Sequence, residues 1–509
     1  MKVCPYKAFS VLESALLSTL RTCPADSSGS ACCTALLTTP LSPQIHTPKD
    51  ELYHTSLLGY WRLDNQQIYP SCIVRPQSPS DISLALSTLV SATENTATCT
   101  IALKSGGHST VIGSTNAEHA VTIDLSLLNS TTYDPETQIA SVGPGARWKG
   151  VYEELAKYEV AVPGGRGGTV GVGGFITGGG NSFHSARFGF TCDAVVNFEI
   201  ILANSTITNA NATSNPSLFK ALKGGSGNFG IVTRFDILTF PVAHHSLWGG
   251  VVTYDHTTTV EAQVKALVKF TDNVHLDPAA SLIPLYTYHS KLGRSVIANS
   301  LVYTTPGVSF PEAFGDFYKM DNLSDTMRWT GLDGLAGELE PESGLHNDFY
   351  TLTFANDPSI LHKAIDIQDR MISEAKRNVK STNWSIISLF QPLPALFAKI
   401  GREKGGNVLG LSEDRNHILD LLWLTWDNES DNNFFNWVGK TYISELEAFA
   451  KSVGGDYPYI YLNYAGADQN PLRSYGEENL VFLQDVAREI DPEGVFQGAV
   501  PGGFKVSRA

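Results

Sequence analysis

The stretch GGRGGTVGVGGFITGGG at residues 164–180 is the feature around which we expect the fold to be organised. Ten of its seventeen residues are glycine, and each glycine inside a regular element costs extra backbone entropy. Such a density is typical of backbone that approaches a planar or anionic ligand too closely for a Cβ atom. A flexible linker is disfavoured because Val170, Val172, Phe175 and Ile176 favour burial. A glycine-packed turn without a ligand is the alternative.

The chain has 509 residues, of which 42% are hydrophobic and 17% charged, as in a globular protein with two or more structural units. Its net charge of −15, without any Lys/Arg cluster, argues against a nucleic-acid partner and an anionic membrane surface. No run of eighteen apolar residues occurs, so we expect no transmembrane span.

The cysteines and N-x-S/T sequons favour passage through the secretory pathway. Six of the seven cysteines lie in the first hundred residues, and none shows CxxC or Cys/His metal spacing. We therefore expect no metal, and one or two disulfides between the N-terminal segment and the first domain. The sequons begin at Asn129, Asn204, Asn211, Asn322, Asn383 and Asn428. We expect an extracellular or vesicular glycoprotein, although Glu13 interrupts the apolar N-terminal tract and no cleavage site is obvious.

The first half of the chain predicts two α/β units after a leader. Residues 1–54 mix a short helical pattern with Ser/Thr/Pro-rich sequence, which indicates a loosely structured leader, and we expect order to begin near Tyr60. Strand patterns at 72–76 and 98–103 flank an amphipathic helix that begins after Ser78, which predicts a β-α-β-like unit. The turn KSGGHST at residues 104–110 follows, and we expect it to face the glycine stretch. Further elements are predicted at 120–125, 138–142, 148–158, 193–203 and 230–240.

From about Pro241 longer amphipathic helices mix irregularly with strands, which predicts a mostly antiparallel sheet with helices on one face. The predicted helices are 260–273, 359–376 and 433–453, and the predicted strands are 281–289, 295–304, 383–390 and 417–426. The YLNY segment at 461–464 is expected to be a strand, and 477–490 a helix.

Several catalytic motifs are missing. The sequence has no GxxxxGK[ST], HExxH or GxSxG, so P-loop chemistry, HExxH zinc proteolysis and α/β-hydrolase catalysis have no support. A GxGxxG pattern does occur at Gly225, Gly227 and Gly230, but a helix precedes it and a strand follows. That order is the reverse of a dinucleotide-binding turn.

Six motifs together resemble those of a known flavoprotein family. They are KSGGHS (104–109), TVGVGG (169–174), GGG (178–180), GGSGNFGIV (224–232), YLNY (461–464) and DPEGVF (491–496). In this order they resemble the FAD-linked oxidases of the berberine-bridge-enzyme type, in the vanillyl-alcohol-oxidase superfamily. The resemblance implies an α+β protein with a two-subdomain PCMH-type FAD-binding domain (55–240), a substrate domain whose antiparallel sheet is covered by helices (241–455), and a segment that returns to the FAD domain (456–509).

The resemblance also implies the residues that bind FAD. His108 matches the histidine that bonds covalently to the flavin 8α-methyl group, and the 104–109 turn would hold the pyrophosphate; an ordinary hydrogen-bonded histidine is the alternative. The expected FAD-binding residues are Lys104, Ser105, Gly106, Gly107, His108, Ser109, Thr169, Val170, Gly173, Gly174, Gly178, Gly179, Ile231, Val232 and Asn463.

Two positions distinguish this chain within the resemblance. Many relatives attach the flavin a second time through a cysteine, where this chain has Gly167, so we expect one covalent link. Val170 matches the position that controls oxygen access, and a small residue there resembles the oxidases that react with O₂. A valine that merely packs is the alternative.

The catalytic residue implied by the resemblance is Tyr461, with a purely structural tyrosine as the alternative. Relatives that oxidise alcohols place a glutamine on a neighbouring strand, where this chain has Leu421, and this departure disfavours simple alcohol oxidation. Weaker candidates for the cavity lining, for which ordinary packing is the alternative, are His184, Tyr286, Tyr288, His289 and Trp423.

These features predict a monomeric FAD-dependent oxidase that transfers a hydride from a hydrophobic natural-product intermediate to flavin, including oxidative cyclisation, with reoxidation by O₂. A redox-neutral isomerase or cyclase on the same scaffold is the first alternative. A carbohydrate oxidase is disfavoured by Gly167, and a non-catalytic binding protein by the intact motifs.

Overall fold

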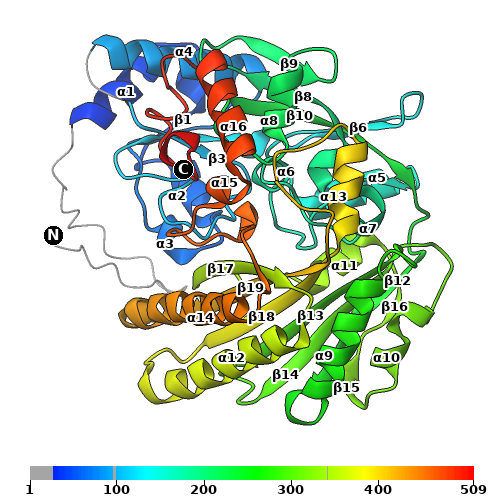
Figure 1. Cartoon of the computed structure of the whole chain (residues 1–509). Helices are drawn as coiled ribbons and strands as arrows, with labels where there is room; N and C mark the ends of the chain where they lie inside the picture. Colours follow the sequence, from blue (N-terminus) through cyan, green and yellow to red (C-terminus); the bar gives the residue numbers. More distant parts are fainter. Residues whose placement is uncertain (1–26, 96–98, 341) are drawn as a thin grey trace.

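The computed structural model describes residues 27–95, 99–340 and 342–509, whose elements form two halves (Figure 1). The blue-to-green segments and the red C-terminal segment of Figure 1 form one half, and the green-to-orange segments form the other. The chain thus passes from the first half to the second and back. The possible signal sequence, with Cys4 and Cys23, lies outside the described residues.

The first sheet contains the expected β-α-β unit. In spatial order its strands are β1 (Ile45–His46), β2 (Cys72–Val74), β4 (Val121–Asp124) and β3 (Ile101–Lys104). Both β2 and β3 pair with β4 in parallel, and helix α4 (Pro79–Asn95) makes the crossover. Because the chain enters the KSGGHS turn at the carboxyl end of β3, this sheet positions the turn.

The second sheet has five antiparallel strands and supports the glycine stretch. Its order is β5 (Thr131–Asp134), β6 (Ile139–Val142), β10 (Ile231–Leu238), β8 (Val195–Ile201) and β9 (Ile207–Asn211). Helix α5 (Trp148–Ala156) precedes the glycine stretch, which itself contains α6 (Val172–Thr177). Helix α8 (Pro216–Leu222) precedes the GGSGNFG turn and β10 follows it, as expected.

Ordered structure begins earlier than expected. Helix α1 (Ser27–Leu37) packs against α4. Disulfides join Cys32 to Cys99 and Cys33 to Cys72, which ties this helix to β2 and to the segment before β3. The expected disulfides are therefore confirmed. The loosely structured leader was wrong for residues 27–54, because buried disulfides stabilise a sequence whose composition alone indicates a coil.

The second half is a nine-stranded antiparallel sheet. Its order is β15 (Asn322–Asp325), β12 (Leu247–Asp255), β14 (Ser295–Tyr303), β13 (Ala280–His289), β18 (Trp384–Leu393), β19 (His417–Trp426), β17 (His346–Ala355) and β20 (Asp456–Tyr457), with β16 (Arg328–Thr330) paired to β12. Helices α9 (His256–Asn273), α12 (Pro358–Asn378) and α14 (Asn432–Ser452) cover one face (Figure 1). The predicted sheet with helices on one face is confirmed.

Three segments differ from the prediction. Strand β12 was missed because Gly249 and Gly250 weaken its pattern, and β17 because it begins with polar residues. The YLNY segment is a short 3₁₀ turn, η6 (Leu462–Tyr464), and not a strand. Its side chains bond to the glycine stretch, and this tertiary contact overrides the β propensity of the tyrosines.

Shorter elements complete the described residues. Further helices are α2 (Glu51–Leu58), α3 (Leu63–Gln66), α7 (Ser185–Phe188), α10 (Gly315–Tyr318), α11 (Leu332–Glu338), α13 (Ala395–Glu403), α15 (Pro471–Ser474) and α16 (Glu477–Ile490). Strands β7 (Val160–Ala161) and β11 (Phe240–Pro241) pair with each other.

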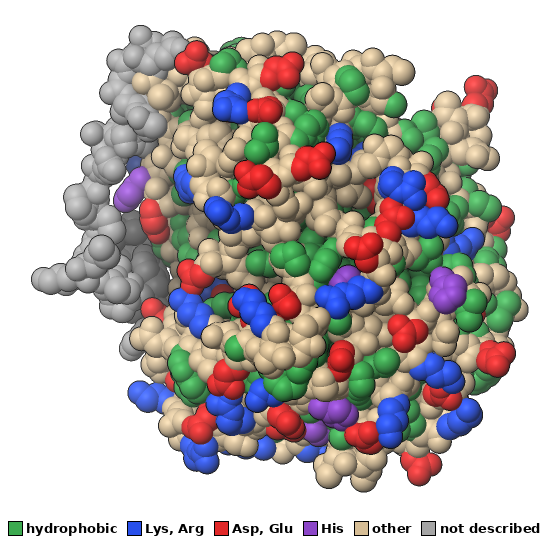
Figure 2. Space-filling view, viewed as in Figure 1, with side chains coloured by type: hydrophobic (Ala, Val, Ile, Leu, Met, Phe, Trp, Pro, Cys, Tyr) green, Lys and Arg blue, Asp and Glu red, His purple; other side chains and the backbone are tan. Residues whose placement is uncertain are grey.

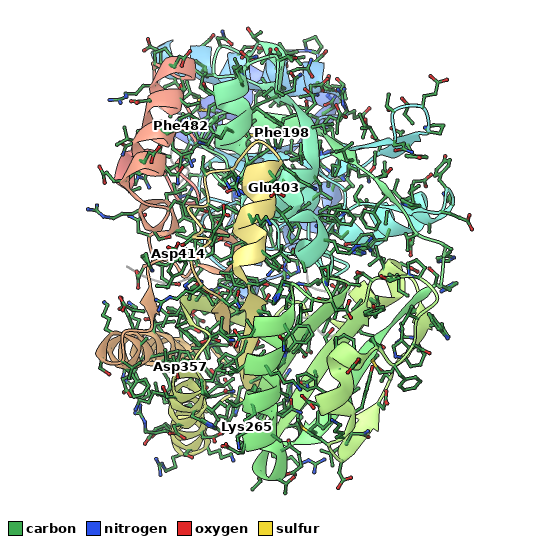
Figure 3. The ribbon with its side chains drawn as sticks, turned by 45° about the vertical axis from the view of Figure 1, so that its right-hand side comes forward. Phe198, Lys265, Asp357, Glu403, Asp414 and Phe482 are labelled. Atoms are coloured by element: carbon green, nitrogen blue, oxygen red, sulfur yellow. A yellow bond between two sulfur atoms is a disulfide. The ribbon has the colours of Figure 1, made fainter. Side chains whose placement is uncertain are left out.

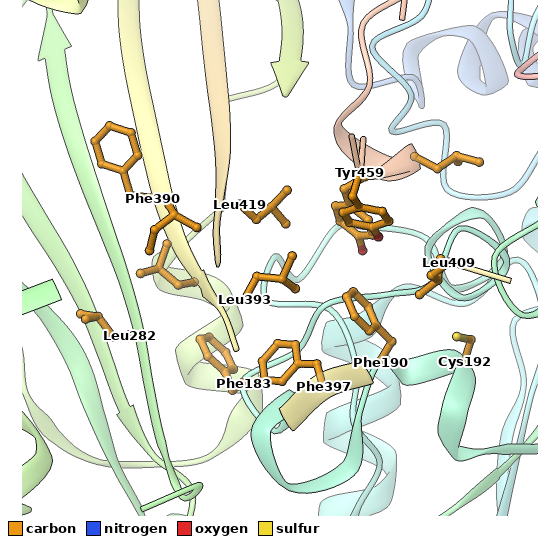
Figure 4. Packing of buried hydrophobic residues seen from close by; sticks show 14 of the residues in the cluster. Phe183, Phe190, Cys192, Leu282, Phe390, Leu393, Phe397, Leu409, Leu419 and Tyr459 are labelled. Atoms are coloured by element: carbon orange, nitrogen blue, oxygen red, sulfur yellow. The ribbon is translucent and has the colours of Figure 1, made fainter. Parts of the chain in front are cut away.

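One apolar core joins the two halves (Figure 4). Phe390 and Leu419 of the large sheet belong to the same buried cluster as Phe190 and Tyr459 of the first half. The ring of Phe397, on α13, meets that of Phe190 edge-on at 5.9 Å. Figure 3 shows α13, marked by Glu403, reaching the half that contains Phe198. The halves are therefore joined by packing as well as by the chain.

The surface is mixed in charge. On the face seen in Figure 2, Lys and Arg side chains are interspersed with Asp and Glu over both halves. Across the described part of the chain, helices long and apolar enough to cross a membrane are absent.

Candidate functional site

A cavity of about 370 Å³ is bounded by residues of both halves. Its walls come from five segments, around residues 103–111, 166–177, 226–232, 461–465 and 500–505, together with Phe349 of β17. The KSGGHS turn and the glycine stretch, which were predicted to face each other, therefore do so. The cavity is the space between them and the large sheet.

The two turns touch through glycine. A Cβ atom on Gly106 would lie 2.5 Å from the backbone of Gly171, and one on Gly171 would lie 2.4 Å from the backbone of Gly106. Arg147 fixes both turns, because its guanidinium donates to the carbonyl oxygens of Gly106 at 3.1 Å and of Thr169 at 2.9 Å. Any side chain at either glycine has to push the turns apart.

Other glycines keep the cavity open. Gly174 and Gly227 line it, and a Cβ atom on either would meet no atom of the described residues within 4 Å. A cleft walled by backbone, with room where side chains would stand, suits an elongated cofactor such as FAD. The predicted FAD-binding residues that line the cavity are Ser105, Gly106, Gly107, His108, Ser109, Val170, Gly173, Gly174, Ile231, Val232 and Asn463.

Four predicted FAD-binding residues lie behind the wall instead: Lys104, Thr169, Gly178 and Gly179. The buried ammonium of Lys104 donates to Asp124 at 3.2 Å and to the carbonyl oxygen of Ser56 at 2.5 Å. Burial lowers the pKa of Lys104, although the Asp124 carboxylate opposes the shift. Lys104 thus fixes β3 and α2 against β4, and its ammonium does not line the cavity.

The two outer glycines serve packing. A Cβ atom on Gly178 would lie 2.1 Å from the amide oxygen of Asn463, and one on Gly179 would lie 3.4 Å from Leu409. Gly179 also has φ +109°, a conformation that side chains other than hydrogen disfavour. A glycine motif therefore mixes residues that face the cofactor space with residues that support it.

His108 faces the cavity from the end of its turn. Its ring stacks on Trp61 with centroids 4.5 Å apart, and its Nε2 lies 3.3 Å from the hydroxyl oxygen of Thr169. Thr169 in turn donates its backbone N–H and its hydroxyl to the Glu340 carboxylate. Burial, assisted by the charge of Arg147, lowers the pKa of His108 to about 3. The imidazole is therefore neutral near pH 7, as a nucleophile must be.

Gly167 and Val170 also line the cavity. A Cβ atom on Gly167 would lie 3.2 Å from Cγ2 of Val170, so this position has nearly enough room for a side chain. The small side chain of Val170 is partly exposed to the cavity. Both positions singled out from the sequence therefore border the expected cofactor space.

Tyr461 lies beneath the glycine stretch. Its hydroxyl oxygen accepts hydrogen bonds from the backbone N–H groups of Gly180 at 3.1 Å and Asn181 at 2.9 Å, and from Nδ2 of Asn463 at 3.0 Å. Burial raises its pKa, which the hydrogen bond from Asn463 opposes. Tyr461 lines the cavity, but its oxygen is fully engaged by the turn.

A polar cluster that the sequence analysis missed lies where the glycine stretch meets the large sheet. Nη2 of Arg166 donates to Oε1 of Gln391 at 2.5 Å and to the hydroxyl oxygen of Tyr464 at 2.8 Å. The Tyr464 hydroxyl also donates to Oε1 of Gln391 at 3.4 Å. The available signal was Gln391 itself, a single amide in the apolar strand WSIISLFQPL.

A glutamine does reach the YLNY segment, but from a different strand than the one that carries Leu421. Leu421 of β19 pairs with Leu389 of β18 and Thr351 of β17 within the sheet. Gln391, which is 1% exposed, reaches the second tyrosine of the YLNY segment. The sequence could not assign the strand, because Gln391 meets Tyr464, 73 residues further along the chain, only once the sheet has formed.

An aromatic wall continues from His108. The ring of Phe349 lines the cavity and lies 5.6 Å from that of Trp61, 5.9 Å from that of Trp423 and 6.0 Å from that of Tyr464. Trp423 thus supports this wall. The other weak candidates do not line the cavity: His184 is buried against Phe240, Tyr286 and Tyr288 pack under α12, and His289 ends β13.

Comparison with known proteins identifies the class of this site. A family profile described as FAD binding domain matches residues 70–211. Over 478 residues the chain is 42% identical to the FAD-dependent monooxygenase sdcF of Emericella nidulans, covering 94% of this chain and 98% of that protein.

The fold is shared with two proteins of known structure. The glucooligosaccharide oxidase of Acremonium strictum, described with a 6-S-cysteinyl, 8α-N1-histidyl FAD, matches with a TM-score of 0.71 and 20% identity over 92% of this chain and 97% of that chain. The berberine bridge enzyme of Eschscholzia californica matches with a TM-score of 0.69 and 18% identity over 94% and 99%. With its cavity, its glycine turns and its relatives considered together, the chain belongs to the FAD-linked oxidoreductases built on the berberine bridge enzyme scaffold.

Proposed function

We propose that this protein oxidises a flat, hydrophobic natural-product intermediate by hydride transfer to FAD, and that O₂ accepts the electrons. The observation that supports this most directly is that one cavity joins the two glycine turns and His108 to an aromatic wall with a single polar cluster. FAD supplies the hydride acceptor when bound. The residues of the chain hold the cofactor, exclude water and move the substrate proton.

His108 is the proposed covalent attachment point, and the link is single. Its neutral ring is fixed by Trp61 and Thr169 at the cavity wall. Gly167 offers no thiol for a second link, whereas the oxidase of A. strictum is described with both a cysteinyl and a histidyl link. Acid-precipitated protein that retains its yellow flavin supports the link, and a colourless pellet contradicts it.

Two tyrosines are candidates for the residue that accepts the substrate proton. Tyr464 presents its hydroxyl to Arg166 and Gln391 at the cavity wall, within reach of a substrate proton. Tyr461, the residue implied by the resemblance, has its oxygen engaged by three donors. We therefore propose Tyr464 as the base, with Tyr461 as the second candidate.

The fate of oxygen separates the proposed oxidase from a monooxygenase, the name given to the E. nidulans relative. An oxidase forms one H₂O₂ per turnover and leaves the product unlabelled under ¹⁸O₂. A monooxygenase places one ¹⁸O atom in the product, reduces the other to water and consumes two further electrons. Turnover without flavin bleaching or O₂ uptake would instead identify the redox-neutral isomerase or cyclase.

The remaining expectations follow from the same arrangement. We propose that residues 55–240 and 456–509 form the FAD unit and 241–455 the substrate unit, because the cavity lies between the sheets of these segments. The disulfides Cys32–Cys99 and Cys33–Cys72 support passage through the secretory pathway. Fractionation of the native host, with the protein found in the medium or in vesicles, tests that location.

A further inference from the structure

Arg166 is a cation of the cavity wall that lacks an acidic partner within the described part of the chain. It lines the large cavity and an adjoining small one of about 30 Å³. Among the described residues no Asp or Glu forms an ion pair with it, and its acceptors are the neutral oxygens of Gln391 and Tyr464, both reached by Nη2. Its Nε and Nη1 donors therefore remain available to a ligand.

Three other cations near the two turns are paired with carboxylates or hydrogen-bonded to the backbone. Arg62 pairs with Asp64 and Asp348, and Lys104 pairs with Asp124. Arg147 donates to three backbone carbonyl oxygens. A cation held against neutral partners in a protein cavity is stabilised when an anion joins it. Arg166 is thus placed to bind a negatively charged ligand. Its charge is not used in an ion pair within the described part of the fold.

Gln391 adds a second donor without an acceptor. The side chain is 1% exposed, its oxygen is engaged by Arg166, and its Nε2 has no partner within the described structure. Buried amide donors are normally satisfied, so an unpaired one beside the cavity indicates a missing acceptor. The Arg166–Gln391 pair is therefore rich in donors and poor in acceptors.

The shape of the wall restricts the ligand further. Phe349 and Tyr464, with ring centroids 6.0 Å apart, stand beside this pair. Such rings pack well against a planar conjugated ligand. The net charge of −15 repels anions from the protein as a whole, so recognition of an anion here depends on the local guanidinium.

We infer that Arg166 is the anion-recognition residue of the substrate site, and that the substrate presents an anionic oxygen on a flat conjugated ring, as a phenolate, enolate or carboxylate. This inference rests on the proposed function, since it places the substrate in the same cavity as FAD. A neutral sugar can accept hydrogen bonds here but brings no negative charge to the guanidinium. Arg166 is a specificity determinant, and it stands inside the glycine stretch between Gly165 and Gly167.

Binding to the flavin-loaded protein tests the inference without turnover. The probes are 2-naphthoate, 2-naphthol and neutral 2-naphthamide, titrated against the absorbance of the bound flavin. Naphthoate is expected to bind about tenfold or more tighter than the amide, because a charge-assisted hydrogen bond contributes more than about 1.4 kcal/mol. Arg166→Gln should abolish this preference, and Arg166→Lys should retain part of it.

A matched variant controls for general effects of removing an arginine. Arg187 is near the glycine stretch, donates to the carbonyl oxygen of Thr304 and does not line the cavity. Arg187→Gln should keep the full preference for naphthoate. Flavin content and circular dichroism establish that each variant is folded. If Arg166→Gln does not fold, Arg166→Lys provides the test.

The two sources of the anion are separated by pH. A site for a carboxylate prefers naphthoate at every pH from about 6 to 9. A site for a phenolate also binds 2-naphthol as its anion, so the naphtholate absorbance band appears below the solution pKa of 2-naphthol. Equal affinity for naphthoate and naphthamide, or a preference that survives Arg166→Gln, overturns the inference. The inference is also overturned if substitution of Arg166 changes the reduction potential of the flavin but leaves the binding of the three probes unchanged. An anion preference in a protein that oxidises nothing leaves the inference standing and refutes the proposed oxidase.

Discussion

The imidazole of His108 and the hydroxyl of Thr169 are joined across the two turns, with Nε2 and Oγ1 3.3 Å apart. Because Thr169 gives its own proton to Glu340, its oxygen is free to accept one from Nε2, and Nδ1 then keeps its lone pair. In the proposed covalent link, the contact would therefore leave Nδ1 as the nitrogen that attacks the flavin.

This relationship predicts the behaviour of two variants. His108→Ala should lose all covalent flavin while the fold is retained. Thr169→Val should slow or reduce covalent attachment without abolishing it, because the nucleophile remains but its tautomer is no longer fixed. Flavin fluorescence of the denatured protein band measures both effects. Full attachment in His108→Ala would exclude this residue as the link.

Gly167→Cys should be accommodated in the folded protein. A Cβ atom at this position would be crowded only by Val170, at 3.2 Å, and the residue lines the cavity. We expect a change in melting temperature of only a few degrees and a second covalent link, seen as altered flavin absorbance. Gly150→Cys is the matched control, since a Cβ atom on Gly150 would meet no described atom within 4 Å, and Gly150 does not line the cavity and should form no link. A reduced, unreacted thiol at position 167 would contradict the expectation.

Three glycine variants should separate folding from cofactor binding. Gly106→Ala and Gly171→Ala force two backbones apart and should lower the free energy of unfolding by at least about 2 kcal/mol. In Gly174→Ala the new methyl group meets no described protein atom within 4 Å, so the protein should fold normally but take up less FAD. Denaturant unfolding and the flavin-to-protein ratio measure the two effects. Normal FAD uptake by Gly174→Ala would place the cofactor elsewhere.

Tyr461→Phe should mainly reduce stability, whereas Tyr464→Phe should mainly reduce turnover. The first removes the acceptor of three donors and should destabilise the protein by about 1–3 kcal/mol or more. The second removes the proposed base and should lower turnover by about 10²–10⁴-fold at near-normal stability. Thermal melts and anaerobic flavin reduction distinguish them. Unchanged turnover in Tyr464→Phe would return the role to Tyr461.

Asp420 predicts a pH dependence of stability. It is buried in β19, one carboxylate oxygen accepts from Tyr442 at 2.8 Å, and the other has no partner among the described residues. Burial raises its pKa to about 8, although the Tyr442 hydrogen bond opposes the shift. The folded state therefore keeps a proton on Asp420 that the unfolded state releases near pH 4. As a result, the free energy of unfolding falls as the pH rises from about 4 towards 8.

Asp420→Asn should remove that dependence. Between about pH 5 and 8 the wild type should lose up to about 1.4 kcal/mol per pH unit relative to this variant, which cannot ionise. Denaturant melts across this pH range measure the difference. Parallel pH profiles for the two proteins would show that Asp420 is ionised in the fold.

The motifs made the flavin turns predictable, because glycine density and the His108 position are local in sequence. Lys104 shows the limit of this reasoning, since its motif position was correct while its ammonium lies against Asp124, behind the cavity wall. The Arg166–Gln391 contact joins residues 225 apart, and its existence depends on the register of β18. No local pattern contains that information.

The N-terminal helix shows a second limit. The sequence indicated a loosely structured leader with a short helical pattern, yet α1 is ordered and held by two disulfides whose partners lie in separate segments. Cysteine spacing predicted that bridges exist but could not say which of them form, because pairing is decided by the three-dimensional positions of the strands.

The contact between Gly106 and Gly171 also limits how this protein can evolve. Each glycine excludes a side chain because of the other's backbone, so the usual route of compensation, in which a larger residue at one site is matched by a smaller one at its neighbour, is closed. Both sites already hold the smallest residue. A side chain at either site therefore has to be accommodated by moving backbone, whereas one at Gly167, on the same cavity wall, would be crowded only by Val170.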